Sequence, residues 1–238
     1  MLDQINIENV LFLDIETVPV YPDYKSMPDI FKPLWDIKSK YIQKEGETDI
    51  DIYRKAGIYA EFGKIICISV GLVKKNGKDF SIRIKSFSGD DEKLLLSDFC
   101  ELLKKHYNRS EHLLCAHNGK EFDFPYLARR ILINGLKLPF LLNIAGKKPW
   151  EVQHLDTLEL WKFGDYKNYT SLNLLAAVFD IPTPKDDING SDVARVYWEE
   201  KNLNRIVTYC QKDVLTIAQL LLRYKGEPLI EETSTFFV

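Results

Sequence analysis

The 238-residue sequence lacks the features of exported and membrane-spanning proteins. No run of apolar residues reaches the 18 or more that a membrane-spanning helix needs. The first ten residues carry acidic and amide side chains where a signal peptide has a basic region followed by an apolar run. The four cysteines are far apart and have neither the paired spacing of a zinc site nor the pattern of a disulfide framework. We therefore expect a cytoplasmic protein with reduced thiols and no membrane partner.

The sequence also lacks an excess of positive charge. With 32 Lys and Arg against 35 Asp and Glu, the formal net charge is −3. This balance argues against a protein that coats nucleic acid electrostatically, but not against an enzyme that acts at one position of a nucleic acid. Repeats and low-complexity tracts are absent, and 45% hydrophobic residues are enough for a substantial core. The length suits one α/β domain.

Strand-like and helix-like segments follow one another along the chain, which predicts an α/β fold. The run from Val10 to Ile15 is almost continuously apolar, as in a central strand that is buried on both faces. Asn76-Gly77 lies between two β-rich segments and predicts an antiparallel hairpin. The expected strands are 10–15, 64–73, 80–87, 112–116 and 153–158, and the expected helices run from 90 or 91 to about 107, from 123 to about 134, from 170 or 171 to about 179, and from about 203 to 224.

Residues 21–62 interrupt this pattern. The segment contains three prolines and many aromatic side chains, and it is too long for a connecting loop in a compact domain. We expect an insertion with some helix of its own. Its aromatic residues either pack the insertion onto the domain, which is the commoner use, or stack on single-stranded bases; they include Tyr24, Phe31, Trp35 and Tyr41.

Asp14 and Glu16 are the first candidate site residues. They lie two residues apart on the first expected strand, so their side chains point to the same face. Two carboxylates in an apolar strand are costly unless they are protonated, paired or coordinated to a metal ion. A hard cation such as Mg²⁺ or Mn²⁺ would stabilise them. Chance is the alternative, because composition alone predicts about one such pair.

Two further acidic positions lie on later elements. Asp123 stands where the second expected helix begins, with Pro125 in the first turn, and a simple N-cap is its alternative role. Tyr209 and Asp213 are four residues apart, so they share one face of the last helix. His154 and Asp156 are supporting groups or, more commonly, core and strand-end residues.

The arrangement of these residues is more informative than any one of them. Each carboxylate stands on an element that would bring it to one end of a single sheet, where open α/β sheets place their sites. Four carboxylates that meet in this way form the ligand set of a two-metal phosphodiesterase. Tyr209, one helical turn before Asp213, would position a water molecule by hydrogen bonding.

At these residues the sequence closely resembles the DEDD superfamily of 3′–5′ exonucleases, in its tyrosine-containing branch. Asp14-Ile-Glu-Thr17 is similar to the first motif, Asn118 with Phe122-Asp123-x-Pro-Tyr-Leu127 to the second, and Tyr209-Cys-x-Lys-Asp213 to the third. Thr208 stands where the sister branch has histidine. The motifs are nearest to the proofreading domain of family-B DNA polymerases, and the resemblance spans about residues 10–225.

The resemblance implies a ribonuclease H-like fold, with a five-stranded mixed sheet flanked by helices. It implies one domain over residues 1–225 and a C-terminal tail at 226–238. The implied activity is a stand-alone, metal-dependent 3′–5′ exonuclease with two Mg²⁺ or Mn²⁺ ions. It would release nucleoside 5′-monophosphates from the 3′ end of single-stranded DNA or from frayed ends.

The resemblance also implies a role for each acidic residue. Asp14, Glu16 and Asp213 would hold the ion that binds the attacking water. Asp14 would bridge to the second ion, Asp123 would assist directly or through water, and Tyr209 would orient the water.

Thr17, Asn118 and Phe122 are the expected contacts to the substrate. Asn118 would bind the terminal nucleotide by hydrogen bonding and Phe122 by packing. Loop capping and core packing are the alternative roles of these two residues.

Two other functions are compatible with the sequence. The first is an RNA 3′-exonuclease, because both branches of the superfamily include ribonucleases. The second is a catalytically silent nucleic-acid-binding or polymerase-accessory module on the same fold. The presence of all four carboxylates and the tyrosine argues against the silent module, and a polymerase or repair partner is left open.

Overall fold

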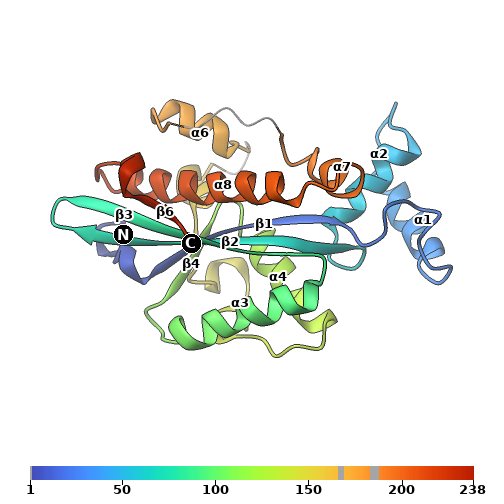
Figure 1. Cartoon of the computed structure of the whole chain (residues 1–238), viewed down its shortest axis with the longest axis horizontal. Coiled ribbons are helices and arrows are strands. Elements are labelled where there is room, and N and C mark those ends of the chain that lie inside the picture. Colours follow the sequence, from blue (N-terminus) through green and yellow to red (C-terminus); the bar gives the residue numbers. More distant parts are fainter. Residues whose placement is uncertain (1, 166–168, 183–187) are drawn as a thin grey trace.

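A six-stranded mixed sheet lies between two layers of helices in the computed structural model, which describes residues 2–165, 169–182 and 188–238 (Figure 1). The strand order across the sheet is β5-β4-β1-β2-β3-β6. Helices α3 and α4 cover one face, and α8 covers the other, with α6 and α7 on the same side (Figure 1). The expected α/β fold with a helix-flanked mixed sheet is confirmed.

β1 (Val10–Pro19) lies in the interior of the sheet, as its apolar sequence predicts. It runs antiparallel to β2 (Gly63–Asn76), which forms the expected hairpin with β3 (Asp79–Ser88). On its other side, β1 runs parallel to β4 (Leu113–Ala116), and β4 runs parallel to β5 (Leu155–Asp156). The carboxyl ends of β1, β4 and β5 therefore lie at one edge of the sheet.

The strands differ from the expectation at two places. The sheet has six strands and not five, because β6 (Thr235–Phe237) in the C-terminal tail pairs in parallel with β3. Three residues are too few for an alternating pattern to be visible in the sequence. The strand expected at 153–158 is shorter, because Asp156 ends it and accepts hydrogen bonds from the first turn of the next helix.

The helices lie close to where their sequence patterns place them. Asp91 caps α3 and Ser171 caps α6, each by accepting a hydrogen bond from a backbone N–H in the first turn. The prolines and the glycine of segment 181–190 predict a loop. Residues 183–187 of this segment lie outside the described residues. The α-helices that flank the sheet are α3 (Glu92–His106), α4 (Asp123–Ile133), α5 (Thr157–Lys162), α6 (Leu172–Val178), α7 (Val193–Trp198) and α8 (Leu203–Tyr224).

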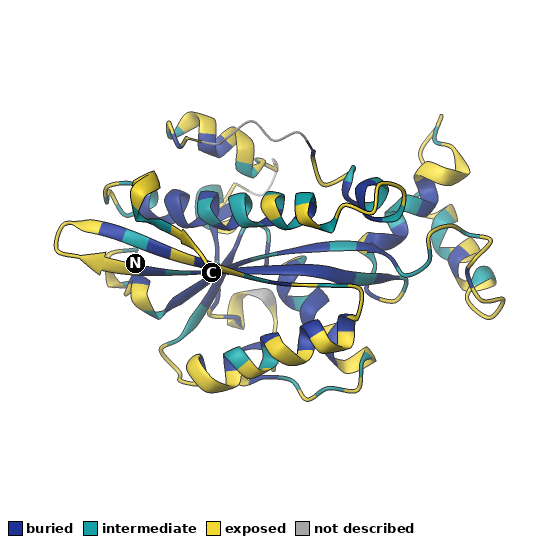
Figure 2. Ribbon diagram, in the orientation of Figure 1, coloured by how far each residue is buried: buried dark blue, intermediate teal, exposed yellow. Residues whose placement is uncertain are grey.

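Alternation along β1 divides the core into two halves. Leu11, Leu13 and Ile15 pack on the side of α3 and α4. Val10 and Phe12 pack on the other side, against the apolar face of α8. Buried residues lie along the strands and on the sides of the helices that are turned to the sheet (Figure 2). The side to which each β1 residue points is thus fixed by two packed layers.

The insertion at 21–62 has its own small core at the far end of β1 (Figure 1). It contains α1 (Lys32–Lys40) and α2 (Asp49–Arg54), so the expected helix is present. Trp35 is only 3% exposed and packs edge-to-face on Tyr53. Packing is therefore the role of Trp35, whereas Tyr41 lies on the surface.

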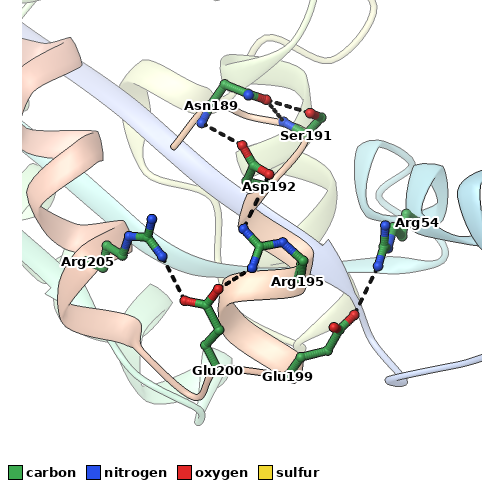
Figure 3. Close-up of polar contacts among 8 residues, drawn as sticks. All are labelled: Arg54, Asn189, Ser191, Asp192, Arg195, Glu199, Glu200 and Arg205. Atoms are coloured by element: carbon green, nitrogen blue, oxygen red, sulfur yellow. Dashed lines mark hydrogen bonds and ion pairs between the residues drawn. The ribbon is translucent and has the colours of Figure 1, made fainter. Parts of the chain in front are cut away.

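Charged side chains connect the insertion with α7 and the start of α8 (Figure 3). Arg54 of the insertion lies 3.0 Å from Glu199 at the end of α7. Glu200 accepts hydrogen bonds from Arg195 of α7 and from Arg205 in the first turn of α8. These contacts hold the beginning of the helix that carries Tyr209 and Asp213.

The remaining regular structure consists of single turns. In the described part of the chain, no helix is long and apolar enough to cross a lipid bilayer. The short 3₁₀ helices are Leu2–Gln4, Ile7–Asn9, Lys55–Ile58, Phe140–Leu142, Pro149–Glu151 and Glu232–Ser234.

Candidate active site

Strand geometry brings Asp14 and Glu16 to the α8 side of the sheet. Side chains two residues apart on a strand point to the same face, so Asp14 and Glu16 lie on the face on which Val10 and Phe12 pack. Glu16 is only 7% exposed, and Asp14 is partly buried. The two carboxylates therefore face the same helix from within the sheet.

A β-bulge lies directly beside this pair. Glu16 is opposite Cys67, whereas Thr17 is opposite Ile65, so Ile66 is an extra residue in β2. Bulges often occur at active sites, where they redirect a side chain. The Thr17 side chain is hydrogen-bonded to the hydroxyl of Tyr126, which also donates to the carbonyl oxygen of Gly57 at 2.7 Å.

Helix α8 supplies the residues that face the β1 pair. The Tyr209 hydroxyl is hydrogen-bonded to the Asp213 carboxylate. The Cys210 thiol donates to the backbone carbonyl of Asp14 at 3.4 Å. Potential ligand atoms of Asp14, Glu16 and Cys210 all lie within 4.8 Å of one another. β1 and α8 thus meet at the predicted residues.

Asp123 reaches the same site from the start of α4, but it is not the helix cap. Phe122 occupies the N-cap position, without a side-chain cap. Asp123 is buried, and its carboxylate accepts a hydrogen bond from the backbone N–H of Ile15 on β1. The N-cap role considered for this aspartate is therefore wrong, because the side chain is directed to the strand. Phe122 packs on Tyr126, with the ring centroids 5.3 Å apart.

Asp156 organises the loop that precedes Asp123. It is only 3% exposed and accepts hydrogen bonds from the backbone N–H groups of Asn118 at 2.9 Å and Lys120 at 3.0 Å. It also accepts from Leu158 and Glu159 at the start of α5. Asn118 has a left-handed backbone conformation, with φ of 61°. Asp156 therefore supports this loop, which is the less common of the two roles that the sequence indicates for it.

His154, the other residue considered beside Asp156, belongs to the core. Its ring accepts a hydrogen bond from the Leu114 N–H at 3.2 Å, and its other ring nitrogen lies 2.7 Å from the Leu141 carbonyl oxygen. The histidine therefore links β4 to the segment before β5.

The four carboxylates give the site a strongly negative electrostatic potential. Burial, followed by repulsion from Glu16, Asp213 and Asp123, raises the pKa of Asp14. Burial and repulsion from Asp213 also raise the pKa of Glu16. Burial raises the pKa of Asp123 to about 7, with Asp156 and Asp213 contributing. Each group thus titrates at higher pH than an isolated carboxyl because like charges meet in a buried place.

One carboxylate oxygen of Asp14 has an unusual environment. Asp14 Oδ2 is buried and has no hydrogen-bond partner. A buried carboxylate oxygen without a partner is costly, and oxygen ligands of this kind are the ones that Mg²⁺ and Mn²⁺ prefer. The residues present therefore fit a divalent cation.

Comparison with known proteins identifies a family. Residues 58–228 match the model of a family described as a predicted 3′–5′ exonuclease related to the exonuclease domain of PolB. The chain belongs to this family. As a member of the PolB-related exonuclease family, it also resembles a DNA polymerase from Pyrococcus glycovorans, with 22% identity over 161 residues. The matched region is 58% of this chain and 20% of that polymerase, so the chain spans about a fifth of the relative's length.

The match to the PolB-related exonuclease family includes two of the four carboxylates. The matched residues contain Asp123, Tyr209 and Asp213, whereas Asp14 and Glu16 on β1 precede them. β1, which carries Asp14 and Glu16, pairs with β2 and β4, and both of these strands lie inside the matched region. The acidic cluster is thus assembled from inside and outside the matched segment.

Proposed function

We propose that this member of the PolB-related family is an active, metal-dependent 3′–5′ exonuclease. It hydrolyses the last phosphodiester bond at the 3′ end of single-stranded DNA or of a frayed end and releases nucleoside 5′-monophosphates. The observation that carries the proposal is the convergence of Asp14, Glu16, Asp123 and Asp213, with Asp14 Oδ2 buried and unpartnered. A purely structural site would not retain mutually repelling buried carboxylates.

The same four carboxylates would hold two Mg²⁺ or Mn²⁺ ions. When bound, such ions lower the pKa of water and neutralise the charge that develops on the leaving oxygen. Binding two divalent ions also changes the formal net charge of the chain from −3 to +1. Affinity for nucleic acid is therefore expected to depend on the metal and to be focused at this edge of the sheet.

Tyr209 would orient the attacking water. Burial and the neighbouring carboxylates of Asp213, Glu16 and Asp14 raise the pKa of its hydroxyl, so the group stays protonated at neutral pH. Since the proton is donated to Asp213, the lone pairs of the hydroxyl oxygen are left to accept a hydrogen bond from water. The tyrosine is thus a positioning group and not a base.

Thr17, Asn118 and Phe122 would form the surroundings of the terminal nucleotide. Phe122 packs on Tyr126, whose hydroxyl is hydrogen-bonded to Thr17, so these three residues are in contact with one another. Asn118 lies in the loop that Asp156 holds. Thr17 follows Glu16 on β1 and Phe122 precedes Asp123, so both residues adjoin the acidic residues along the chain.

A degradation assay tests the proposal. The substrates are 5′-labelled single-stranded DNA and RNA of one sequence, with Mg²⁺, Mn²⁺ or EDTA, and the enzymes are the wild type and the Asp14→Ala variant. We expect a DNA ladder that shortens from the 3′ end and that is absent with EDTA and with the variant. The relationship to a DNA polymerase favours DNA, and faster shortening of RNA would replace the substrate assignment.

The control variant is Asp98→Ala, which removes an exposed carboxylate of α3. It should shorten DNA at the wild-type rate. Binding of the oligonucleotide by the wild type without degradation in any metal would refute the exonuclease and leave a binding module.

A further inference from the structure

A cavity of about 350 Å³ opens beside the loop that precedes Asp123. Asn118 and Lys120 of this loop line one side, and Trp150 and Lys162 line the cavity from later segments. Its volume is at the small end of the range for ligand sites, which is about 300–1,000 Å³. A single heterocyclic ring system is a suitable occupant in size.

Trp150 is the aromatic side chain of this cavity. It is 74% exposed, although tryptophan is among the side chains that gain most from burial. The ammonium group of Lys148 lies 5.2 Å from the centroid of its ring. An exposed tryptophan beside cations is the combination that single-stranded nucleic acids bind, through stacking of bases and attraction of the backbone.

The charges around the cavity favour binding of a neutral base over binding of a phosphate. Lys120 is paired with Glu159 at 2.5 Å, and Glu121 also lines the cavity. Asp156 contributes a further negative charge. Because three acids and two lysines line the cavity, it has no excess of positive charge, which suits a neutral nucleobase better than a phosphate.

The cavity is connected to the acidic site through the backbone. Asp156 binds the N–H groups of Asn118 and Lys120, and both residues line the cavity. The same loop leads directly into Phe122 and Asp123 at the start of α4. A group bound in the cavity would therefore contact the loop that precedes Asp123.

We propose that this cavity binds the nucleobase of a nucleotide on the 5′ side of the scissile bond, stacked on Trp150. The inference rests on the proposed exonuclease function and deepens it, because it assigns a second base-binding subsite. Substrates with at least one nucleotide before the terminal one use the subsite, and a single nucleotide ester does not.

The first experiment compares two substrates in the wild type and in Trp150→Ala. For a single-stranded oligonucleotide we expect KM to rise about five- to tenfold, with kcat almost unchanged. For the p-nitrophenyl ester of thymidine 5′-monophosphate, which has no preceding nucleotide, we expect the same kinetics in both proteins. Trp150→Phe should retain most of the oligonucleotide affinity, and Phe140→Ala, which removes another exposed aromatic ring, should behave as wild type.

The second experiment identifies the base that is bound. Oligonucleotides with one abasic nucleotide at the second, third or fourth position from the 3′ end are compared in binding assays with Ca²⁺ or EDTA. One of these positions should weaken binding to the wild type and have no further effect on Trp150→Ala.

The outcomes separate the subsite from the activity. Unchanged oligonucleotide KM and unchanged binding in Trp150→Ala, with hydrolysis intact in both proteins, would overturn the subsite and leave the exonuclease standing. Failure of the wild type to hydrolyse either substrate would overturn the exonuclease, and the binding comparison would still decide the subsite.

Discussion

The hydroxyl of Tyr209 is hydrogen-bonded to the carboxylate of Asp213, one turn further along α8. Residues four apart on a helix lie on the same face, so the helix itself holds this pair in register. The pair faces Asp14 and Glu16, which influence the pKa of the tyrosine. Its place in the site is thus set by one helix packed on one strand.

Removal of the Tyr209 hydroxyl should affect turnover and leave binding almost unchanged. In Tyr209→Phe we expect kcat to fall about tenfold to a hundredfold, because the water loses the group that orients it. KM for single-stranded DNA should stay within about twofold, since the ring is retained. Steady-state kinetics on a labelled oligonucleotide measures both values.

Tyr224→Phe is the matched control for this substitution. It also removes a hydroxyl from α8, one that donates to the Thr157 carbonyl oxygen at 3.3 Å. Its kcat should equal that of the wild type. Unchanged turnover in Tyr209→Phe would rule out the water-orienting role.

The metal-free protein should lose stability as the pH rises. A carboxyl group whose pKa is higher in the folded than in the unfolded state takes up a proton on folding, so its ionisation lowers the free energy of unfolding. For Asp123 this loss extends from near the ordinary value of 3.8 to about 7. Asp14 and Glu16 are shifted in the same direction.

The Asp14→Asn variant isolates this effect. In EDTA we expect wild type and variant to melt at similar temperatures near pH 4, and the variant to melt a few degrees higher near pH 8, which corresponds to about 2 kcal/mol. Mg²⁺ or Mn²⁺ should reduce the difference by stabilising the wild type. Asp98→Asn serves as the exposed control, and equal melting of Asp14→Asn and wild type at pH 8 would contradict the repulsion.

Asp156 should be necessary for the loop that precedes Asp123. Asp156→Ala leaves buried backbone N–H groups without an acceptor, so we expect the free energy of unfolding to fall by about 2–4 kcal/mol. Asp156→Asn keeps one acceptor oxygen, so its free energy of unfolding should lie between that of Asp156→Ala and that of the wild type. Urea denaturation measures the order of the three proteins, and an Asp156→Asn protein as unstable as Asp156→Ala would argue against this account.

A buried ion pair links the insertion to the two helices below the sheet. Arg130 of α4 donates to Glu92 of α3 at 2.8 Å and to the carbonyl oxygen of Ala60 at 2.8 Å. Glu92 also accepts from the Ile65 N–H at 2.7 Å. Removal of one partner leaves a buried charge, so Glu92→Ala and Arg130→Ala should each cost about 3–5 kcal/mol.

The double variant tests whether the two residues act as a pair. Glu92→Ala with Arg130→Ala should cost clearly less than the sum of the single changes in urea denaturation. Glu101→Ala, which breaks an exposed pair with Lys105, should cost less than about 1 kcal/mol. Additive losses in the double variant would mean that the partners contribute independently.

The parts of the site that have a regular period could be predicted from the sequence. Asp14 and Glu16 follow the strand period, and Tyr209 and Asp213 follow the helix period, so spacing alone indicates their faces. The structure places them together, as predicted. The catalytic and metal-binding roles of these residues stay predictions until the assays are made.

The parts that depend on irregular backbone could not be predicted in the same way. Asp123 resembles an N-cap because it precedes a proline in the first turn, but the cap position falls on Phe122, since the Asp123 carboxylate binds the Ile15 N–H. Asp156 resembles a strand residue, and its four backbone donors come from two segments that only the fold brings together. In both cases the role of the aspartate is determined by contacts with other segments of the chain.

The short β6 strand has a consequence for the behaviour of the protein in solution. It covers Ile82, Arg83 and Ile84 of β3, the strand that would otherwise end the sheet. An uncovered strand offers free N–H and C=O groups to other chains, whereas a three-residue strand offers few. Truncation before Thr235 should therefore increase self-association on heating, as measured by light scattering. Hydrolysis at the acidic site, at the other end of the strands, should be unchanged.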